Sequence, residues 1–151
     1  LGKRGPYDAS QGSVARLWRL RPGVHPTEQF GVDKFLAGDL KGNEWTPVLT
    51  YVDGRLSEER LAEALNVHKY VGLVGLYAAA RFQSAGAGTA SLKLTAAPAL
   101  GAWIDGQAIK LDDLAKTKLT AGNHTLIVKL DPKKLPATLR VESTDVTFLA
   151  D

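Results

Sequence analysis

The sequence predicts an all-β fold of short antiparallel strands, and three observations support this. Apolar and polar residues alternate with a period of two over 76–83, 91–96, 125–130 and 139–142, as expected for strands that bury one face. Clusters rich in Gly, Ala, Asp, Asn and Pro separate these segments at short intervals. One segment, 57–66, has the features of a helix. Many short strands joined by turns are typical of a sandwich or barrel.

The length and composition are those of an ordinary folded domain. The chain has 151 residues, enough for one domain with a sizeable core. Hydrophobic residues make up 44% and charged residues 23%, which is typical of globular proteins. The formal net charge of +3 is too small to predict a polyanionic partner. Because cysteine is absent, the chain cannot hold a disulfide, a thiol nucleophile or a covalently attached c-type haem.

The N-terminal segment differs in character from the rest. Residues 1–13 are rich in Gly and Ser, and we expect a linker or docked arm there, followed by a single β-sandwich domain over 14–151. The chain starts neither with Met nor with a signal peptide, and no stretch approaches the roughly 18 apolar residues that span a bilayer. We therefore expect a domain cut from a longer protein.

The first half of the domain is predicted to be mostly irregular. A first strand is expected over 14–20, with Pro22 and the glycine after it ending the strand. Residues 22–47 are interrupted by Pro and Gly, which indicates a long surface loop of the kind that often carries function. The helix over 57–66 has Ser57 as its N-cap and acidic residues in its first turn.

Two Asp-Gly pairs are predicted to be turns. Asp105 and Gly106 separate two short apolar segments by two residues, the spacing of a type I′ hairpin, and this explanation is favoured over a ligating role. Asp53 and Gly54 stand in a tetrapeptide of similar composition, but a helix follows them. They are expected to close the loop region. A last strand is predicted over 146–148.

Four segments of the second half follow one another in a distinctive order. They are YAAARF (77–82), SLKL (91–94), AWIDGQ (102–107) and LTAGNHTLIVK (119–129). Together they resemble the galactose-binding-like jelly-roll modules of β-galactosidase-type hydrolases, of protective-antigen-type modules and of large exported bacterial proteins, some of which contain c-type cytochrome domains. Asp105 stands where that family usually has Asn.

The resemblance implies a β-sandwich of the jelly-roll, galactose-binding-like type. It also implies a non-catalytic accessory module of a larger exported protein, in the periplasm, at the cell surface or outside the cell, which binds carbohydrate or packs on neighbouring domains. The alternative is a purely structural interaction domain of an exported c-type cytochrome or oxidoreductase, whose haem or active site lies elsewhere in the parent chain. Fold by itself does not decide between these functions.

Three residues are the candidates for ligand binding. Trp45 lies in the irregular region, and Tyr77 and Arg81 are predicted to share one strand face. An aromatic ring and a guanidinium on one face can stack on and hydrogen-bond to a sugar or a protein partner. The alternative, slightly favoured, is that this face packs within the domain.

Signals for metals and catalysis are weak. His25, His68 and His124 are far apart in the sequence and lack the spacing of a metal site. Asp112 and Asp113 could join a structural calcium site, which occurs in many sandwich modules, but adjacent acids are more often solvated, so calcium is not favoured. No motif for a nucleophile or a phosphate-binding loop is found. No other cofactor is expected, and the chain is predicted not to be an enzyme.

A basic and aromatic stretch raises the question of nucleic-acid binding. Residues 16–21, RLWRLR, could contact phosphates through arginine and stack a base on tryptophan. A strand with a buried Trp18 and arginines that extend to solvent is the simpler explanation, because charge is nearly balanced elsewhere. Neither nucleic acid nor a membrane is expected as a partner.

Overall fold

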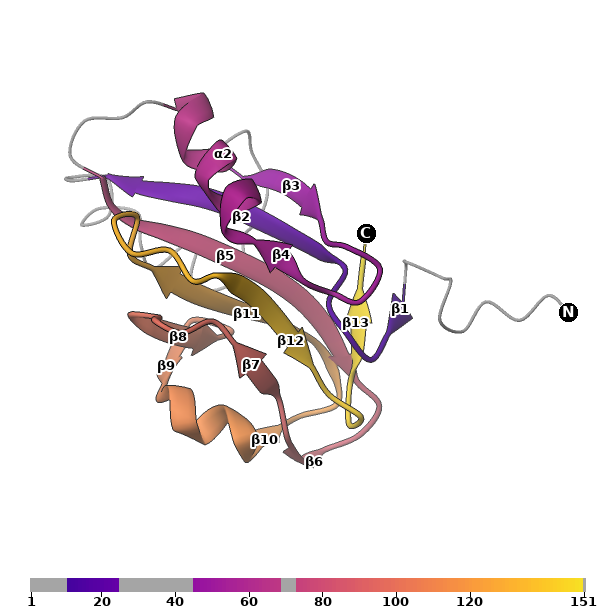
Figure 1. Cartoon of the computed structure of the whole chain (residues 1–151). Helices are drawn as coiled ribbons and strands as arrows, with labels where there is room; N and C mark the ends of the chain where they lie inside the picture. The colour runs from indigo at the N-terminus through magenta and orange to yellow at the C-terminus, as the bar shows by residue number, and fades with distance from the viewer. Residues whose placement is uncertain (1–10, 25–44, 69–72, 151) are drawn as a thin grey trace, which may run out of the picture.

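The computed structural model describes residues 11–24, 45–68 and 73–150, which form a mostly β structure with antiparallel sheets and one short α-helix (Figure 1). The elements, in chain order, are β1 (Gln11–Gly12), β2 (Leu17–Val24), β3 (Thr46–Leu49), β4 (Leu56–Ser57), α2 (Glu58–His68), β5 (Leu73–Ser84), β6 (Gly88–Ala90), β7 (Lys93–Thr95), β8 (Gly101–Ile104), β9 (Gln107–Ile109), the 3₁₀ helix η2 (Leu111–Ala115), β10 (Thr117–Leu119), β11 (Gly122–Leu130), β12 (Thr138–Glu142) and β13 (Thr147–Leu149).

The long strand β5 organises the largest sheet, which has eight strands. One side of β5 pairs with β11 from Leu76 to Ser84. Its other side is shared, because β2 pairs with the first half of β5 and β13 with the second half. β8 and β9 extend the sheet beyond β11, β3 lies beside β2, and β1 lies beside β13. Two smaller sheets, β4-β12-β7 and β10-β6, complete the described strands.

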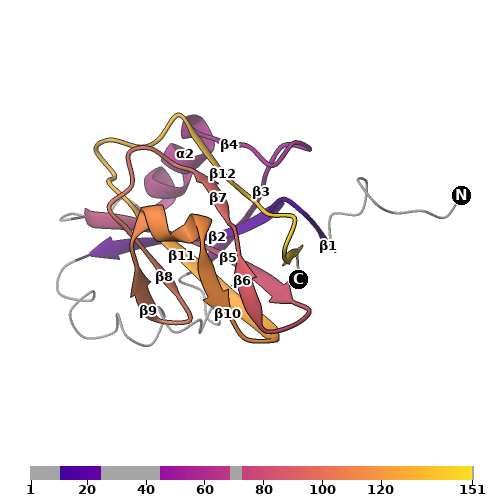
Figure 2. The ribbon, with the colours of Figure 1, turned by 90° about the horizontal axis from the view of Figure 1, so that it is seen from below.

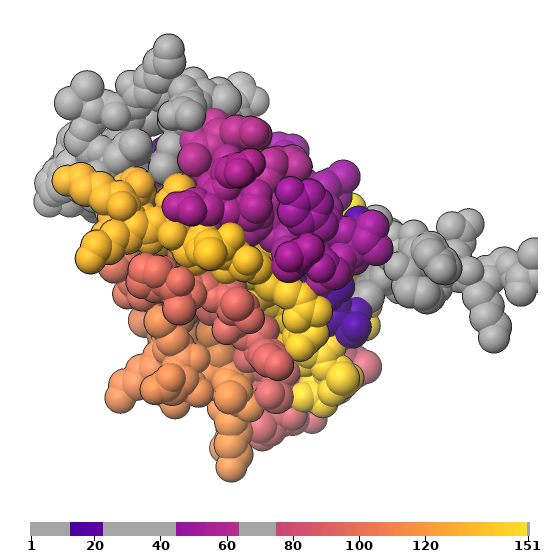
Figure 3. Space-filling model, viewed as in Figure 1, coloured from indigo at the N-terminus to yellow at the C-terminus, as the bar shows by residue number. Residues whose placement is uncertain are grey.

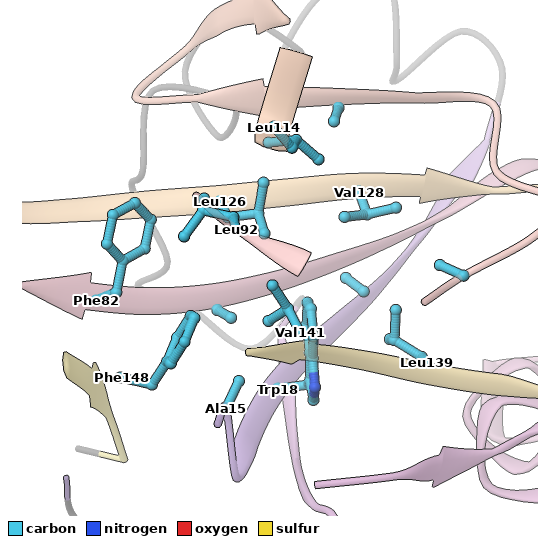
Figure 4. Packing of buried hydrophobic residues seen from close by; sticks show 14 of the residues in the cluster. Ala15, Trp18, Phe82, Leu92, Leu114, Leu126, Val128, Leu139, Val141 and Phe148 are labelled. Carbon is cyan, nitrogen blue, oxygen red and sulfur yellow. The ribbon is translucent and has the colours of Figure 1, made fainter. Parts of the chain in front are cut away.

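The main hydrophobic core lies between the large sheet and the small sheet β4-β12-β7. Leu126 and Val128 of β11 share one buried cluster with Leu139 and Val141 of β12 and with Trp18 of β2 (Figure 4). In the space-filling view, the purple, yellow and salmon atoms of β4, β12 and β7 form adjacent bands on one face (Figure 3). Apolar side chains at alternate positions therefore meet across two layers, as the period of two predicts.

The strand β5 departs from the predicted pattern of one buried face. Leu76, Ala78, Ala80 and Phe82 enter the main core, but Tyr77 and Ala79 on the other face are also buried. The prediction of a half-buried strand is therefore wrong for this part of β5. Small alanines and a central position between β2 and β11 allow both faces to be covered.

The predicted helix is confirmed. It spans Glu58–His68, and the Arg60 backbone N–H donates to Oγ of Ser57 at 3.3 Å, as expected for an N-cap. Glu58 and Glu59 lie in its first turn, where carboxylates interact favourably with the helix dipole.

The predicted end of the first strand is wrong. β2 continues through Pro22, which pairs with Leu76 of β5. The neighbouring strand β3 reaches only from Leu17 to Leu20 of β2. Beyond that point β5 is the one strand that pairs with β2 in the described chain. Pro22 is tolerated there because a proline can lie in a strand whose N–H side has no partner strand.

Some predictions fall outside the described residues. Most of the predicted loop over 22–47, and His25 with it, lies in 25–44, which is outside the described ranges. Of the predicted N-terminal arm, Gln11 and Gly12 are described and pair with β13. None of the helices in the described part of the chain is long and apolar enough to cross a membrane.

Candidate functional site

The structure brings two of the three predicted binding residues together, in the interior. Trp45 and Tyr77 are 5% and 1% exposed, and they pack with Ala79 and Ile127 in a second apolar cluster. Trp103, which is partly buried, packs against this cluster, with its ring 6.2 Å from that of Tyr77. In this arrangement the rings of Trp45 and Tyr77 do not face solvent, so neither offers a surface on which a sugar could stack.

Arg81 lies on the same face of β5 but outside that cluster. It is half-buried and lies between Thr125 of β11 and Leu149 of β13 in the sheet register. Ligand binding by Trp45, Tyr77 and Arg81 stays a prediction, and it would require the two rings to become accessible.

The Asp105-Gly106 hairpin is held to the neighbouring strand by its aspartate. Asp105 and Gly106 have φ of +52° and +86°, as a two-residue type I′ turn requires. The Asp105 backbone N–H donates to the carbonyl of Thr125 at 3.0 Å, and the Thr125 N–H donates to Oδ1 of Asp105 at 2.9 Å. The carboxylate therefore replaces the carbonyl that the turning chain no longer presents to β11. Figure 2 shows the β8-β9 hairpin beside β10.

The same carboxylate holds a buried histidine. Nδ1 of His124 lies 2.6 Å from Oδ2 of Asp105, and its Nε2 lies 2.8 Å from the carbonyl oxygen of Thr120. The imidazole is 7% exposed and stacks on Phe82. Burial lowers the pKa of His124, but the hydrogen bonds to Asp105 and Thr120 outweigh it, and the pKa is raised above its ordinary value.

This arrangement limits what His124 can do chemically. Both ring nitrogens face acceptors, so both donate when the ring is protonated, and neither is left to take a proton from a substrate. A hollow of about 320 Å³ adjoins the pair, lined also by Gln107 and Lys118. The sequence does not predict this pair, because Asp105 and His124 lie 19 residues apart and the spacing of the histidines bears only on metal binding. The sequence signal for this pair is Asp105, which stands where the galactose-binding-like modules usually have Asn.

The second Asp-Gly pair forms a different turn. The Gly54 N–H donates to the Tyr51 carbonyl at 2.9 Å, and the Tyr51 N–H donates to the Arg55 carbonyl at 3.0 Å. Gly54 has φ of +88°. A three-residue loop that ends in a left-handed glycine has this pattern of bonds. The predicted loop closure is confirmed as a turn, and it fixes the backbone between β3 and β4.

Three exposed apolar side chains lie on this turn or at the end of β3 beside it, and we call them the apolar tip. Leu49, Tyr51 and Val52 are 54%, 52% and 73% exposed. Large apolar residues with such exposure are uninformative singly, but three of them within four residues of the chain indicate a contact surface. The Arg55 guanidinium lies over the Tyr51 ring at 5.8 Å from its centroid.

Two arginines next to the apolar tip are paired with carboxylates. Nε of Arg55 lies 2.6 Å from Oδ2 of Asp53, and an Arg140 nitrogen lies 2.7 Å from Oε2 of Glu142. The Arg140 Nε–H also donates to the Asp53 carbonyl at 2.8 Å. Hydrogen bonds from the backbone and guanidinium of Arg55 lower the pKa of Asp53, and Arg140 lowers the pKa of Glu142. These pairs neutralise two arginines, while Arg16, whose Nε–H donates to Oγ1 of Thr50 at 3.3 Å, adds a positive charge beside the tip.

The described residues contain no group of three or more His, Cys, Asp or Glu side chains that could hold a metal ion. Asp112 and Asp113, considered for calcium, are exposed on η2. Binding of a structural calcium ion stays untested.

Comparison with known proteins gives no relative: no family model, curated protein or solved structure matches the chain. The resemblance to galactose-binding-like modules therefore stays a prediction based on the four segments of the second half.

Proposed function

We propose that this chain is a non-catalytic accessory module of a larger exported protein and that it packs on a neighbouring domain through the apolar tip. Its proposed fold type is a β-sandwich of the jelly-roll, galactose-binding-like kind. The observation that carries the proposal is the exposure of Leu49 at the end of β3 and of Tyr51 and Val52 on the hydrogen-bonded turn that follows. Aromatic residues held rigidly at a surface are typical anchors of protein interfaces, because little conformational entropy is lost on binding.

The pairing of two nearby arginines with carboxylates favours a protein surface as the partner. Arg55 and Arg140 are each paired with a carboxylate, so Arg16 beside Thr50 adds too little positive charge to attract a polyanion. The full engagement of His124 supports a role without catalysis, since a general base needs a ring nitrogen that can reach a substrate.

Carbohydrate binding is the second candidate, and one observation favours it. Tyr51 presents an aromatic ring at the surface beside the polar groups of Asp53 and Arg55, a combination that suits the apolar face and hydroxyls of a sugar. Arg55 already lies over this ring and already holds the Asp53 carboxylate. Fewer groups are therefore left for a sugar than for an apolar protein surface.

The proposal is tested by cross-linking in the full-length parent protein. A photoreactive phenylalanine analogue replaces Tyr51, and in a matched control it replaces Leu100, which is 55% exposed on another loop. We expect cross-links to a neighbouring domain from position 51 and far fewer from position 100. A cytochrome or oxidoreductase domain identified at the cross-link would specify the structural alternative.

Two results would contradict docking through the apolar tip. One is equal cross-linking from positions 51 and 100. The other is binding of the isolated chain to a polysaccharide on a glycan array that Tyr51→Ala abolishes, which would support the carbohydrate function instead.

A further inference from the structure

The strand β7 forms one edge of the small sheet. The sheet order is β4-β12-β7, so β12 is the one strand that pairs with β7 in the described chain. Edge strands present backbone groups that can pair with another extended chain.

Two separate hydrogen bonds show that Leu94 points its backbone outward. The Ala15 N–H donates to the Val141 carbonyl at 3.0 Å, so Val141 turns its backbone groups away from β7. Its register partner Leu94 is therefore in a non-hydrogen-bonded pair. At the preceding outward position, the Leu92 N–H donates to the Leu114 carbonyl of η2 at 2.8 Å. Because directions alternate along a strand, the Leu94 N–H and carbonyl face the same side as those of Leu92.

A hollow of about 540 Å³ lies on that side, between the end of β7 and η2. Its lining is mainly apolar and includes Leu94, Pro98, Leu111 and Ala115. Leu111 is 38% exposed. In the view from below, η2 lies beside the β7 ribbon (Figure 2). The hollow is thus an apolar groove that runs along a free strand edge.

The lining of the groove carries one positive and one negative side chain. Lys93 and Asp112 are the charged residues of its lining. Nζ of Lys93 lies 3.9 Å from Oε1 of Glu142. No described basic side chain forms an ion pair with the exposed Asp112. On the η2 side of the groove, Asp112 is therefore the charged group that a basic side chain of a bound peptide would contact.

We propose that the groove between β7 and η2 binds an extended peptide segment of a partner protein, in which an apolar side chain enters the groove and a neighbouring Lys or Arg contacts Asp112. The peptide main chain pairs with the N–H and carbonyl of Leu94, which adds a strand to the small sheet. Since β7 has only three residues, few main-chain bonds form, and the apolar side chain provides much of the affinity. This surface is separate from the apolar tip and does not depend on the function proposed for it.

The proposal is tested with a phage-displayed library of random linear peptides selected on the whole chain. We expect enrichment of sequences in which apolar positions alternate with Lys or Arg. With a selected peptide, Asp112→Lys should weaken binding about tenfold or more, because like charges then meet. The matched control Asp113→Lys changes an adjacent acid that does not line the groove, and it should leave affinity nearly unchanged.

Amide hydrogen exchange of the unmutated chain separates strand addition from other modes of binding. Saturating peptide should slow exchange at Leu94 but not at the apolar tip. The proposal is overturned if no peptide is enriched, if Asp112→Lys and Asp113→Lys have equal effects, or if Leu94 exchange does not change. Concentration-dependent dimers that protect Leu94 without peptide would instead identify a second copy of the chain as the occupant.

Discussion

Two tetrapeptides of similar composition, Tyr51–Gly54 and Trp103–Gly106, form turns of different kinds. Around Asp105-Gly106 both central residues have positive φ, and the strands β8 and β9 pair directly on either side. Around Asp53 the loop has three residues, of which only Gly54 has positive φ, and the flanking strands pair with other partners. The dipeptide Asp-Gly therefore predicts a turn, while the strands on either side decide its type.

The two aspartates also differ in the range of their contacts. Asp53 is exposed and binds Arg55, two residues away. Asp105 binds Thr125 and the buried His124, which belong to the neighbouring strand. One carboxylate shapes its own turn, and the other fastens a hairpin to the sheet. The sequence environment of each tetrapeptide does not reveal this difference.

The largest effect is expected from adding a methyl group to the glycine of each turn. In Gly54→Ala the new Cβ would overlap Cγ2 of Val14, and φ is +88°. Left-handed strain and overpacking together should lower the free energy of unfolding by about 2–5 kcal/mol. In Gly106→Ala, at an exposed position with φ +86°, the strain of about 1–2 kcal/mol acts alone. Urea denaturation of both variants measures this, and equal losses would contradict the difference between the turns.

Removing each carboxylate should give the next largest difference. Asp105→Ala leaves the Thr125 N–H and Nδ1 of His124 without their acceptor, which should cost about 1–3 kcal/mol in the free energy of unfolding. Asp53→Ala removes an exposed pair and should not measurably shift the thermal midpoint. If the two variants melted alike, the carboxylate of Asp105 would have no special part in holding the hairpin.

The smallest difference is expected in the pH dependence of the free energy of unfolding, which only the turn at Asp105 should affect. The pKa of His124 is raised above 6.5 in the folded chain. Its contribution to stability is therefore fully present below about pH 6.5 and is lost as pH rises through the folded pKa. The free energy of unfolding at pH 6 minus that at pH 9 should be more positive for the unmutated chain than for His124→Gln. Parallel pH profiles of the two chains would show that the Asp105–His124 pair contributes nothing.

Local features were predictable from the sequence. Alternation identified the strands β5, β11 and β12, Ser57 marked the start of α2, and the spacing around Asp105-Gly106 predicted a type I′ hairpin. Each of these features depends on residues that are close together in the sequence, so local propensity and periodicity are enough to predict it.

Features that depend on strand neighbours were not predictable. Pro22 continues β2 because β3 has already ended beside it. Tyr77 is buried because the second face of the sheet is also covered, although the alternation around it predicted a half-buried strand. His124 meets Asp105 only through the pairing of β11 with β8. A pattern of period two shows that two faces differ, but it does not show what covers each face.

The sequence by itself determined that this chain is mostly β, where its turns lie and which residues form the main core, because these follow from local backbone preference and from burying apolar surface. Only the tertiary structure decided that Trp45 and Tyr77 are buried, that Asp105 holds His124 and that the apolar tip and the edge of β7 are exposed. The physical reason is that sheet order and register bring together residues far apart in the sequence, and no local pattern specifies them.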